Sequence, residues 1–142
     1  MDARRFGRVF METEASSKAP TVLIVDDFED SRAMYATFLR YSGYGVVEAA
    51  NGLEAIQQAT SVLPDVIVMD LSLPELDGWE ATRRIKSEPK TGRIPIVALT
   101  GHTLEGPTQD ARRAGCDVFL AKPCLPDTLL QTIRTLLDRR AD

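Results

Sequence analysis

Five polar side chains suited to phosphate chemistry lie at the ends of four short hydrophobic segments of this 142-residue chain. They are Asp26, Asp27, Asp70, Thr100 and Lys122. Carboxylate oxygens, without histidine or thiolate, are the ligands that Mg²⁺ and Mn²⁺ prefer. Three carboxylates brought close together repel one another unless a cation joins them. The residue types therefore predict an acidic site that binds a divalent cation.

Asp70 is the predicted nucleophile of this set. Since Mg²⁺ takes only one or two carboxylates directly, Asp70 can bind the metal through one oxygen and attack phosphorus with the other. Lys122 and the metal would stabilise the charge on the transferred phosphoryl group, and the Thr100 hydroxyl would donate a hydrogen bond to it. The set predicts metal-dependent phosphoryl transfer to an aspartate.

Taken one at a time, these residues have ordinary structural explanations. An Asp-Asp pair after a strand can cap a helix, and Asp70 can begin a turn before Pro74. A single lysine is most often a surface residue, and Thr100 alone is most often a hydroxyl at a strand end. Only their joint placement favours a shared site.

Hydrophobic patterns predict an alternation of strands and helices from Thr21 onward. Apolar runs predict strands at 22–25, from 46, at 66–69, 94–99 and 118–121, the fourth entered through Pro95. Helices are predicted at 29–42, from a cap at Asn51 to about Ser61, and at 79–87, 106–114 and 126–139.

The helical periodicity also predicts which residues face the core. In the first helix Met34, Phe38 and Tyr41 share one face, with Tyr35 and Leu39 beside it. In the second, the predicted inward residues are Leu53, Ile56 and either Ala59 or Thr60. In the third they are Ala81 and Ile85, and in the last Leu129, Ile133, Leu136 and Leu137.

Strands alternating with helices predict a doubly wound α/β domain with helices on both faces of a parallel sheet. Ligands bind beyond the carboxyl ends of the strands in such sheets, which is where the five polar residues would meet. Residues 20–142 form this predicted domain. Residues 1–19 lack a clear period and are predicted to be a disordered tail, in which Met11 offers a second candidate start of translation.

Composition narrows the class of protein. The formal net charge is −4, which argues against a general nucleic-acid binder. No apolar run approaches the roughly 18 residues of a membrane helix. Cys116 and Cys124 flank a predicted strand that would hold them roughly 25 Å apart, too far for a disulfide. Reduced thiols are typical of a cytoplasmic protein.

At this point the sequence resembles the receiver domain of the two-component response-regulator family, similar in extent to the stand-alone chemotaxis type. The likeness covers about residues 20–140. The motifs that carry it are VLIVDD at 22–27, VIVMDLSLPELDGW at 66–79, IVALTG at 96–101 and FLAKP at 119–123. The resemblance implies a flavodoxin-like (βα)5 fold whose five-stranded parallel sheet has the order 2-1-3-4-5.

The resemblance also implies a role for each matching residue. Asp70 would be the phosphoacceptor, Asp27 a direct metal ligand and Asp26 its acidic neighbour acting largely through water. The backbone carbonyl of Ser72 would be a further metal ligand. Lys122 would pair with the phosphoryl group.

The remaining implied roles concern switching and loop shape. Thr100 would turn toward the phosphoryl group, and Phe119 would move inward with it. The backbone N–H of Gly101 would bind phosphate, although glycine replaces the alanine frequent at this position and predicts a more mobile loop. Phe119 lacks the hydroxyl of the tyrosine often found there.

Several positions have structural or tuning roles by the same resemblance. Pro74 and Gly78 would shape a loop, and the Lys122–Pro123 peptide would be cis. Ser72 and His102 occupy two variable positions that tune phosphate lifetime in the family.

The implied function is a signalling switch that is not an enzyme acting on other molecules. It would accept phosphate from a sensor histidine kinase or a phosphotransfer protein, without nucleic acid or membrane as partner. It would then signal to a protein target through the surface of helix 106–114, strand 118–121 and helix 126–139, or pass phosphate onward. A stand-alone protein and the receiver module of a hybrid kinase both fit.

Two other functions stay open at this stage. An aspartate-nucleophile phosphatase would require an acid two residues after the nucleophile, where this chain has Ser72. A scaffold that keeps the fold without phosphorylation would not need the acidic pair and the lysine. A nucleotide-binding module is disfavoured because no glycine-rich phosphate loop follows a strand.

Overall fold

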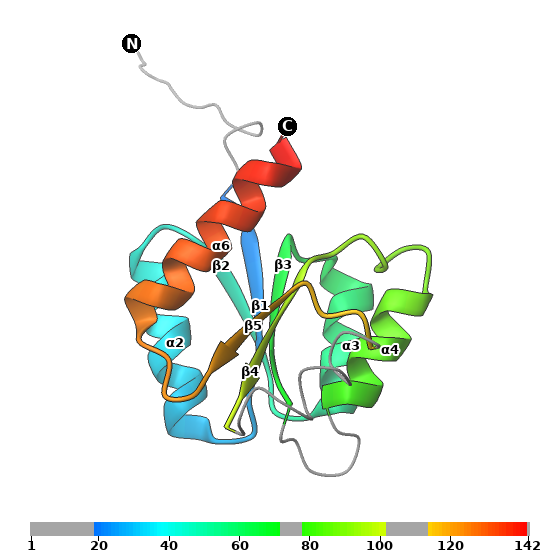
Figure 1. The fold of residues 1–142 in the computed structure, drawn as a ribbon, viewed down its shortest axis with the longest axis horizontal. Coiled ribbons are helices and arrows are strands. Elements are labelled where there is room, and N and C mark those ends of the chain that lie inside the picture. The colour runs from blue at the N-terminus through cyan, green and yellow to red at the C-terminus, as the bar shows by residue number, and fades with distance from the viewer. Residues whose placement is uncertain (1–18, 72–77, 102–113, 142) are drawn as a thin grey trace.

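A parallel β-sheet covered by helices on both faces forms the described part of the protein (Figure 1). The structure is a computed structural model, and it describes residues 19–71, 78–101 and 114–141. The strands are β1 (Thr21–Val25), β2 (Gly45–Ala49), β3 (Val66–Asp70), β4 (Ile96–Thr100) and β5 (Val118–Ala121). The helices within these ranges are α2 (Glu29–Tyr41), α3 (Gly52–Val62), α4 (Gly78–Ser87) and α6 (Pro126–Ala141).

The sheet order is β2-β1-β3-β4-β5, and every neighbouring pair is parallel. This is the predicted doubly wound, flavodoxin-like arrangement. Helices α2 and α6 lie on one face of the sheet and α3 and α4 on the other, as Figure 1 shows. The change of direction occurs at β1 and β3, whose carboxyl ends carry the acidic residues.

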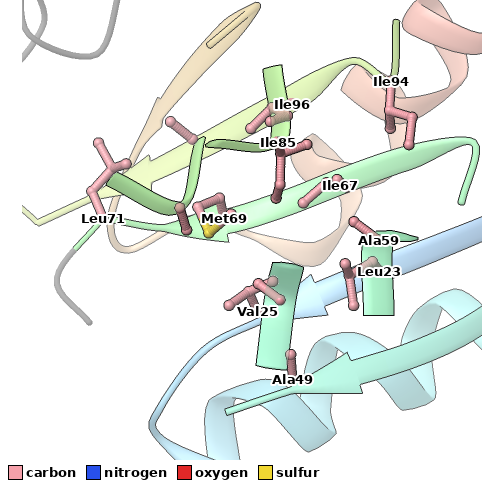
Figure 2. Close-up of a cluster of buried hydrophobic side chains, with 13 residues drawn as sticks. Leu23, Val25, Ala49, Ala59, Ile67, Met69, Leu71, Ile85, Ile94 and Ile96 are labelled. Atoms are coloured by element: carbon pink, nitrogen blue, oxygen red, sulfur yellow. The ribbon is translucent and has the colours of Figure 1, made fainter. Parts of the chain in front are cut away.

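The central strands are buried on both faces, which explains their continuous apolar runs. Alternate residues enter two separate cores. One core lies under α3 and α4 and includes Leu23, Ile67, Met69 and Ile96, as Figure 2 shows. The other lies under α2 and α6 and includes residues that alternate with these along the same strands, such as Val22, Ile24, Val68 and Val97.

One element boundary differs from its prediction at a proline. Strand β4 begins at Ile96, so Pro95 precedes the strand, and Thr100 is its last residue. Proline has no N–H for the sheet, which is why the strand starts after it. Asn51 caps α3 as predicted, because its side chain accepts a hydrogen bond from the Glu54 N–H at 2.9 Å. The predicted helix 106–114 lies outside the described residues apart from Ala114.

Two predicted helix faces are confirmed only in part, since Phe38 and Ile56 are partly buried and Ala59 is buried. On α2 the buried residues are Tyr35, Ala36 and Leu39, whereas Met34 and Tyr41 are exposed. On α3 the buried residues include Ala55 and Ala59.

The predicted inward residue Leu53 is half exposed and Ile56 is only partly buried. The small residues Ala55 and Ala59 are buried on α3, and the larger Leu53 and Ile56 are more exposed than they are. The predicted inward residues of α4 and α6 are confirmed, including Ile85 and Ile133.

Both cysteines are free thiols, as predicted. Burial raises the pKa of the Cys116 thiol to about 11 and also raises the pKa of Cys124. Within the described residues, none of the helices is long and apolar enough to cross a membrane.

Gly78 is predicted to be required for the close contact between α4 and the end of β3. A Cβ at this position would overlap the Asp70 carbonyl oxygen and the Leu71 Cα. We expect Gly78→Ala to lower the free energy of unfolding by about 2 kcal/mol, as forced overpacking does. Urea unfolding measures this. Gly101→Ala is the matched control, because a Cβ there meets no atom within 4 Å. Equal stability of both variants would contradict the prediction.

Candidate phosphate and metal site

Three carboxylates meet where β1 and β3 end. Asp26 and Asp27 directly follow β1, and Asp70 is the last residue of β3. One ligand oxygen from each lies within 4.8 Å of the others. Asp26 and Asp70 are buried and Asp27 is exposed, so the cluster has two fixed acids and one that faces solvent. The structure thus brings together the acids that the sequence pattern placed in one site.

Asp26 has an unusual hydrogen-bonding pattern. Its Oδ1 accepts a hydrogen bond from the Phe28 N–H at 2.9 Å. Its Oδ2 is buried and has no hydrogen-bond partner within the described part of the chain. A buried carboxylate oxygen without a donor is costly, and a cation bound between acids would remove that cost. The donor set therefore fits a hard divalent cation such as Mg²⁺.

Lys122 approaches the same cluster from the end of β5. Its Nζ lies 3.0 Å from Asp70 Oδ2, and its side chain is 31% exposed. The Lys122 backbone N–H donates to the Thr100 carbonyl at 2.8 Å, which continues the pairing of β4 with β5. The Lys122–Pro123 peptide bond is cis. The lysine therefore contacts the predicted acceptor while its side chain remains partly exposed to solvent.

Thr100 lies on β4, the strand next to the acceptor strand β3, and Phe119 lies on β5, one strand further along the sheet. Thr100 is buried at the end of β4 and pairs in register with Ala121 of β5. Phe119 is partly buried against the core under α3 and α4. Thr100 therefore follows the residue that pairs with Asp70, Leu99, and lies beside the site, whereas Phe119 pairs with Ala98 and lies further from the strand ends.

A surface groove of about 630 Å³ opens beside Lys122. Its lining includes Phe28 and Tyr35 from the β1–α2 side and Gly101, Pro123 and Cys124 from the loops after β4 and β5. It gives an incoming group a route to the strand ends.

Several predicted positions cannot be placed. Ser72, Pro74 and His102 lie outside the described residues, so the Ser72 carbonyl stays a predicted ligand. Gly78 is the first residue of α4, and Gly101 directly follows β4.

Two residues that sequence reasoning missed contact the loops of the site. The Arg32 Nη1 donates to the Asp26 carbonyl at 2.9 Å, and the Tyr35 hydroxyl donates to the Cys124 carbonyl at 2.6 Å. Burial raises the pKa of Tyr35 above its usual value of 10, and the nearby charges of Cys124 and Asp26 add to this effect. These two bonds to the loops end on backbone carbonyls, so no motif of side chains marks them. Their position on the first turns after the acidic pair is the only sequence signal.

The fold and the site define a class of small α/β signalling domains that carry an acidic pocket at the strand ends. The family model of the response regulator receiver domain matches residues 22–134. The chain belongs to this family.

Similar proteins support this assignment. The chain is 33% identical over 117 residues to the polar-differentiation response regulator DivK of Brucella anthropi, covering 82% of this chain and 95% of that protein. The chemotaxis protein CheY4 of Vibrio cholerae is 34% identical with a TM-score of 0.80, covering 84% of this chain and 99% of that one. The receiver domain of the Pseudomonas aeruginosa sensor histidine kinase PA1611 is 33% identical with a TM-score of 0.79. The match covers 84% of this chain and 98% of that one. That structure is described with a magnesium ion in its active-site cleft.

The unsatisfied oxygen of Asp26 predicts opposite effects of one substitution with and without metal. We expect Asp26→Asn to raise the free energy of unfolding by about 1 kcal/mol in metal-free buffer, because it removes a buried repulsive charge. Millimolar Mg²⁺ should stabilise the wild type and have little effect on the variant, since a ligand stabilises the state that binds it. Urea unfolding with and without MgCl₂ measures both effects.

Asp138→Asn, a change of an exposed acid on α6, is the control and should respond to Mg²⁺ like the wild type. An Asp26→Asn variant that gained as much stability from Mg²⁺ as the wild type would contradict a metal site at this cluster.

Proposed function

We propose that Asp70 accepts a phosphoryl group from the phosphohistidine of a sensor kinase or phosphotransfer protein, and that the protein signals through this change. Proteins of this family are signalling phosphoacceptors, which supports the proposal. The observation that carries it is the contact of Lys122 Nζ with Asp70 Oδ2 at 3.0 Å beside the acidic pair. In that arrangement the positive charge of Lys122 lies next to the buried carboxylate of Asp70, which also belongs to the candidate cation site.

The transfer would be an in-line displacement at phosphorus. One carboxylate oxygen of Asp70 forms the new P–O bond as the P–N bond to the donor histidine breaks, and the imidazole leaves and is protonated. Mg²⁺ held by Asp26, Asp27, Asp70 and the Ser72 carbonyl, or Mn²⁺ in its place, would neutralise charge on the phosphoryl oxygens. Lys122 would bind a phosphoryl oxygen in place of its present contact with Asp70, and the Gly101 N–H would donate to another.

Thr100 and Phe119 would convert this local change into a change of surface. The Thr100 hydroxyl would turn toward the phosphoryl group on Asp70 and donate a hydrogen bond to one of its oxygens, and this motion would leave space beside β5. Phe119 would then pack further inward. The surface of β5 and α6 would differ between the two states, and a protein partner could distinguish them.

The two cysteines bear on where the protein acts. Free thiols at Cys116 and Cys124 favour a reducing compartment, so we propose a cytoplasmic location. The chemistry would be limited to the protein's own phosphorylation and dephosphorylation. No observation in the described residues favours a phosphatase or a non-phosphorylated scaffold.

Acetyl phosphate provides the direct test of the proposal. We expect wild-type protein incubated with acetyl phosphate and Mg²⁺ to gain the mass of one phosphoryl group, and chelation of the metal to slow labelling at least roughly a hundredfold. Intact-protein mass spectrometry measures this. Asp70→Asn should take no label, and Asp65→Asn is a control acid at the other end of β3. Full labelling of Asp70→Asn would exclude Asp70 as the acceptor.

A second prediction separates acceptance of phosphate from signalling. Thr100→Val removes the hydroxyl but keeps the size of the side chain. We expect it to be labelled within about tenfold of the wild-type rate, because loss of one neutral hydrogen bond costs about 1 kcal/mol. The NMR shift changes that phosphorylation causes along β5 and α6 should be much smaller than in the wild type.

Thr82→Val, a substitution of a buried threonine on α4, is the matched control. Wild-type-like shift changes in phosphorylated Thr100→Val would show that the hydroxyl does not link the site to this surface.

A further inference from the structure

Helix α2 contacts the backbone on both sides of the phosphate site. The first contact is made by Arg32, whose side chain is only 17% exposed. Its Nη1 donates to the Asp26 carbonyl at 2.9 Å, and its Nε donates to Glu48 Oε1 at 3.0 Å. The planar guanidinium thus joins the loop after β1 to strand β2. Because Asp26 and Asp27 share that loop, the bond restricts where both carboxylates lie.

Glu48 allows this contact to be separated from a general charge effect. Its second oxygen accepts a hydrogen bond from Arg40 Nη2 at 3.4 Å, and Arg40 also donates to the Val46 carbonyl. Arg40 is therefore an arginine of the same helix with the same acidic partner, but its hydrogen bonds do not include the Asp26 carbonyl. It provides a matched control for Arg32.

The second contact of α2 is made by Tyr35. Its ring is buried, and its hydroxyl donates to the Cys124 carbonyl at 2.6 Å. Cys124 follows Lys122 by two residues. The Lys122 backbone N–H donates a hydrogen bond to the Thr100 carbonyl of the neighbouring strand β4. The backbone that carries Lys122 is thus held at both ends, and Tyr35 provides the end that faces α2.

We propose that Arg32 and Tyr35 are positioning residues, Arg32 for the metal-binding acids and Tyr35 for the phosphate-binding lysine. The inference rests on the proposed function, because it assigns each residue to one part of the phosphoryl-transfer site. Each side chain reaches the site through a hydrogen bond to a backbone carbonyl, that of Asp26 for Arg32 and that of Cys124 for Tyr35. Each should therefore affect a different step: metal binding for Arg32 and transfer at saturating metal for Tyr35.

The sign of the Arg32 effect distinguishes positioning from simple electrostatics. A positive charge beside the acidic loop repels a divalent cation, so loss of the charge alone would strengthen Mg²⁺ binding. Loss of the bond to the Asp26 carbonyl would weaken it. Arg32→Lys keeps the charge and removes the two-point fork, so this variant isolates the geometric contribution.

The experiment measures two quantities on each variant. Isothermal titration calorimetry gives the Mg²⁺ dissociation constant without any phosphorylation, and acetyl phosphate at saturating Mg²⁺ gives the labelling rate. For Arg32→Lys we expect roughly tenfold weaker Mg²⁺ binding, as loss of an outer partner of a metal ligand causes, with a labelling rate within about twofold of wild type. For Tyr35→Phe we expect roughly tenfold slower labelling and an Mg²⁺ dissociation constant within about twofold of wild type.

Two control variants test whether any substitution of these residue types on α2 changes Mg²⁺ binding or labelling. Arg40→Lys and Tyr41→Phe alter the same residue types on the same helix, and Tyr41 is 91% exposed. Both should match the wild type in the two measurements. The inference would be overturned by wild-type values for Arg32→Lys and Tyr35→Phe, or by a parallel fall of both quantities in both variants.

Failure of the proposed function gives a different result. A wild-type protein that took no phosphate would refute phosphoryl transfer to Asp70. The positioning inference would then be decided by Mg²⁺ affinity in Arg32→Lys and by amide hydrogen exchange at Lys122 in Tyr35→Phe. Faster exchange at Lys122 than in Tyr41→Phe would support Tyr35 as its anchor, and equal exchange would exclude it.

Discussion

The crowding of negative charge at one end of the sheet is the constraint on which the rest of the structure depends. Three carboxylates have oxygens within 4.8 Å of one another, and two of the acids are buried. Folding brings these charges together against their repulsion, and the Lys122 amine offsets the charge of Asp70 at 3.0 Å. Among residues 19–71, 78–101 and 114–141, Asp26 Oδ2 has no hydrogen-bond partner. The described part of the fold therefore holds an acidic pocket whose charge and unpartnered oxygen both favour a divalent cation and an incoming phosphoryl group.

The parallel sheet makes this crowding possible. Strands β1, β3 and β4 are buried on both faces, so their apolar side chains fix the register and direction of the backbone. Since all the strands run the same way, their carboxyl ends lie at one edge and deliver the acids, Thr100 and Lys122 to one place. Hydrophobic packing thus determines the positions of charged groups that would otherwise separate, and helix α2 adds polar contacts to the two loops that leave this edge.

Much of the fold and site could be predicted from particular residues. Continuous apolar runs at β1 and β3 indicated strands covered on both faces, and the polar residues at their ends indicated the edge where a ligand would bind. The Asn51 cap was predictable because its hydrogen bond is local. The faces of α2 and α3 were predicted only in part, because the exposed Met34 and Leu53 are as hydrophobic as their buried neighbours. Their exposure depends on how closely each helix approaches the sheet, which the helix sequence alone does not encode.

The sequence by itself determined the order of elements, the identity of the five polar residues and the chemistry open to them, since these follow from residue type and local periodicity. Only the tertiary structure decided that Lys122 contacts Asp70, that one oxygen of Asp26 has no donor among the residues the structure describes, and that Arg32 and Tyr35 contact the two loops. The physical reason is that these contacts join residues far apart in the chain or end on backbone carbonyls. A carbonyl is present at every residue, so only its position in three dimensions shows which one is bound.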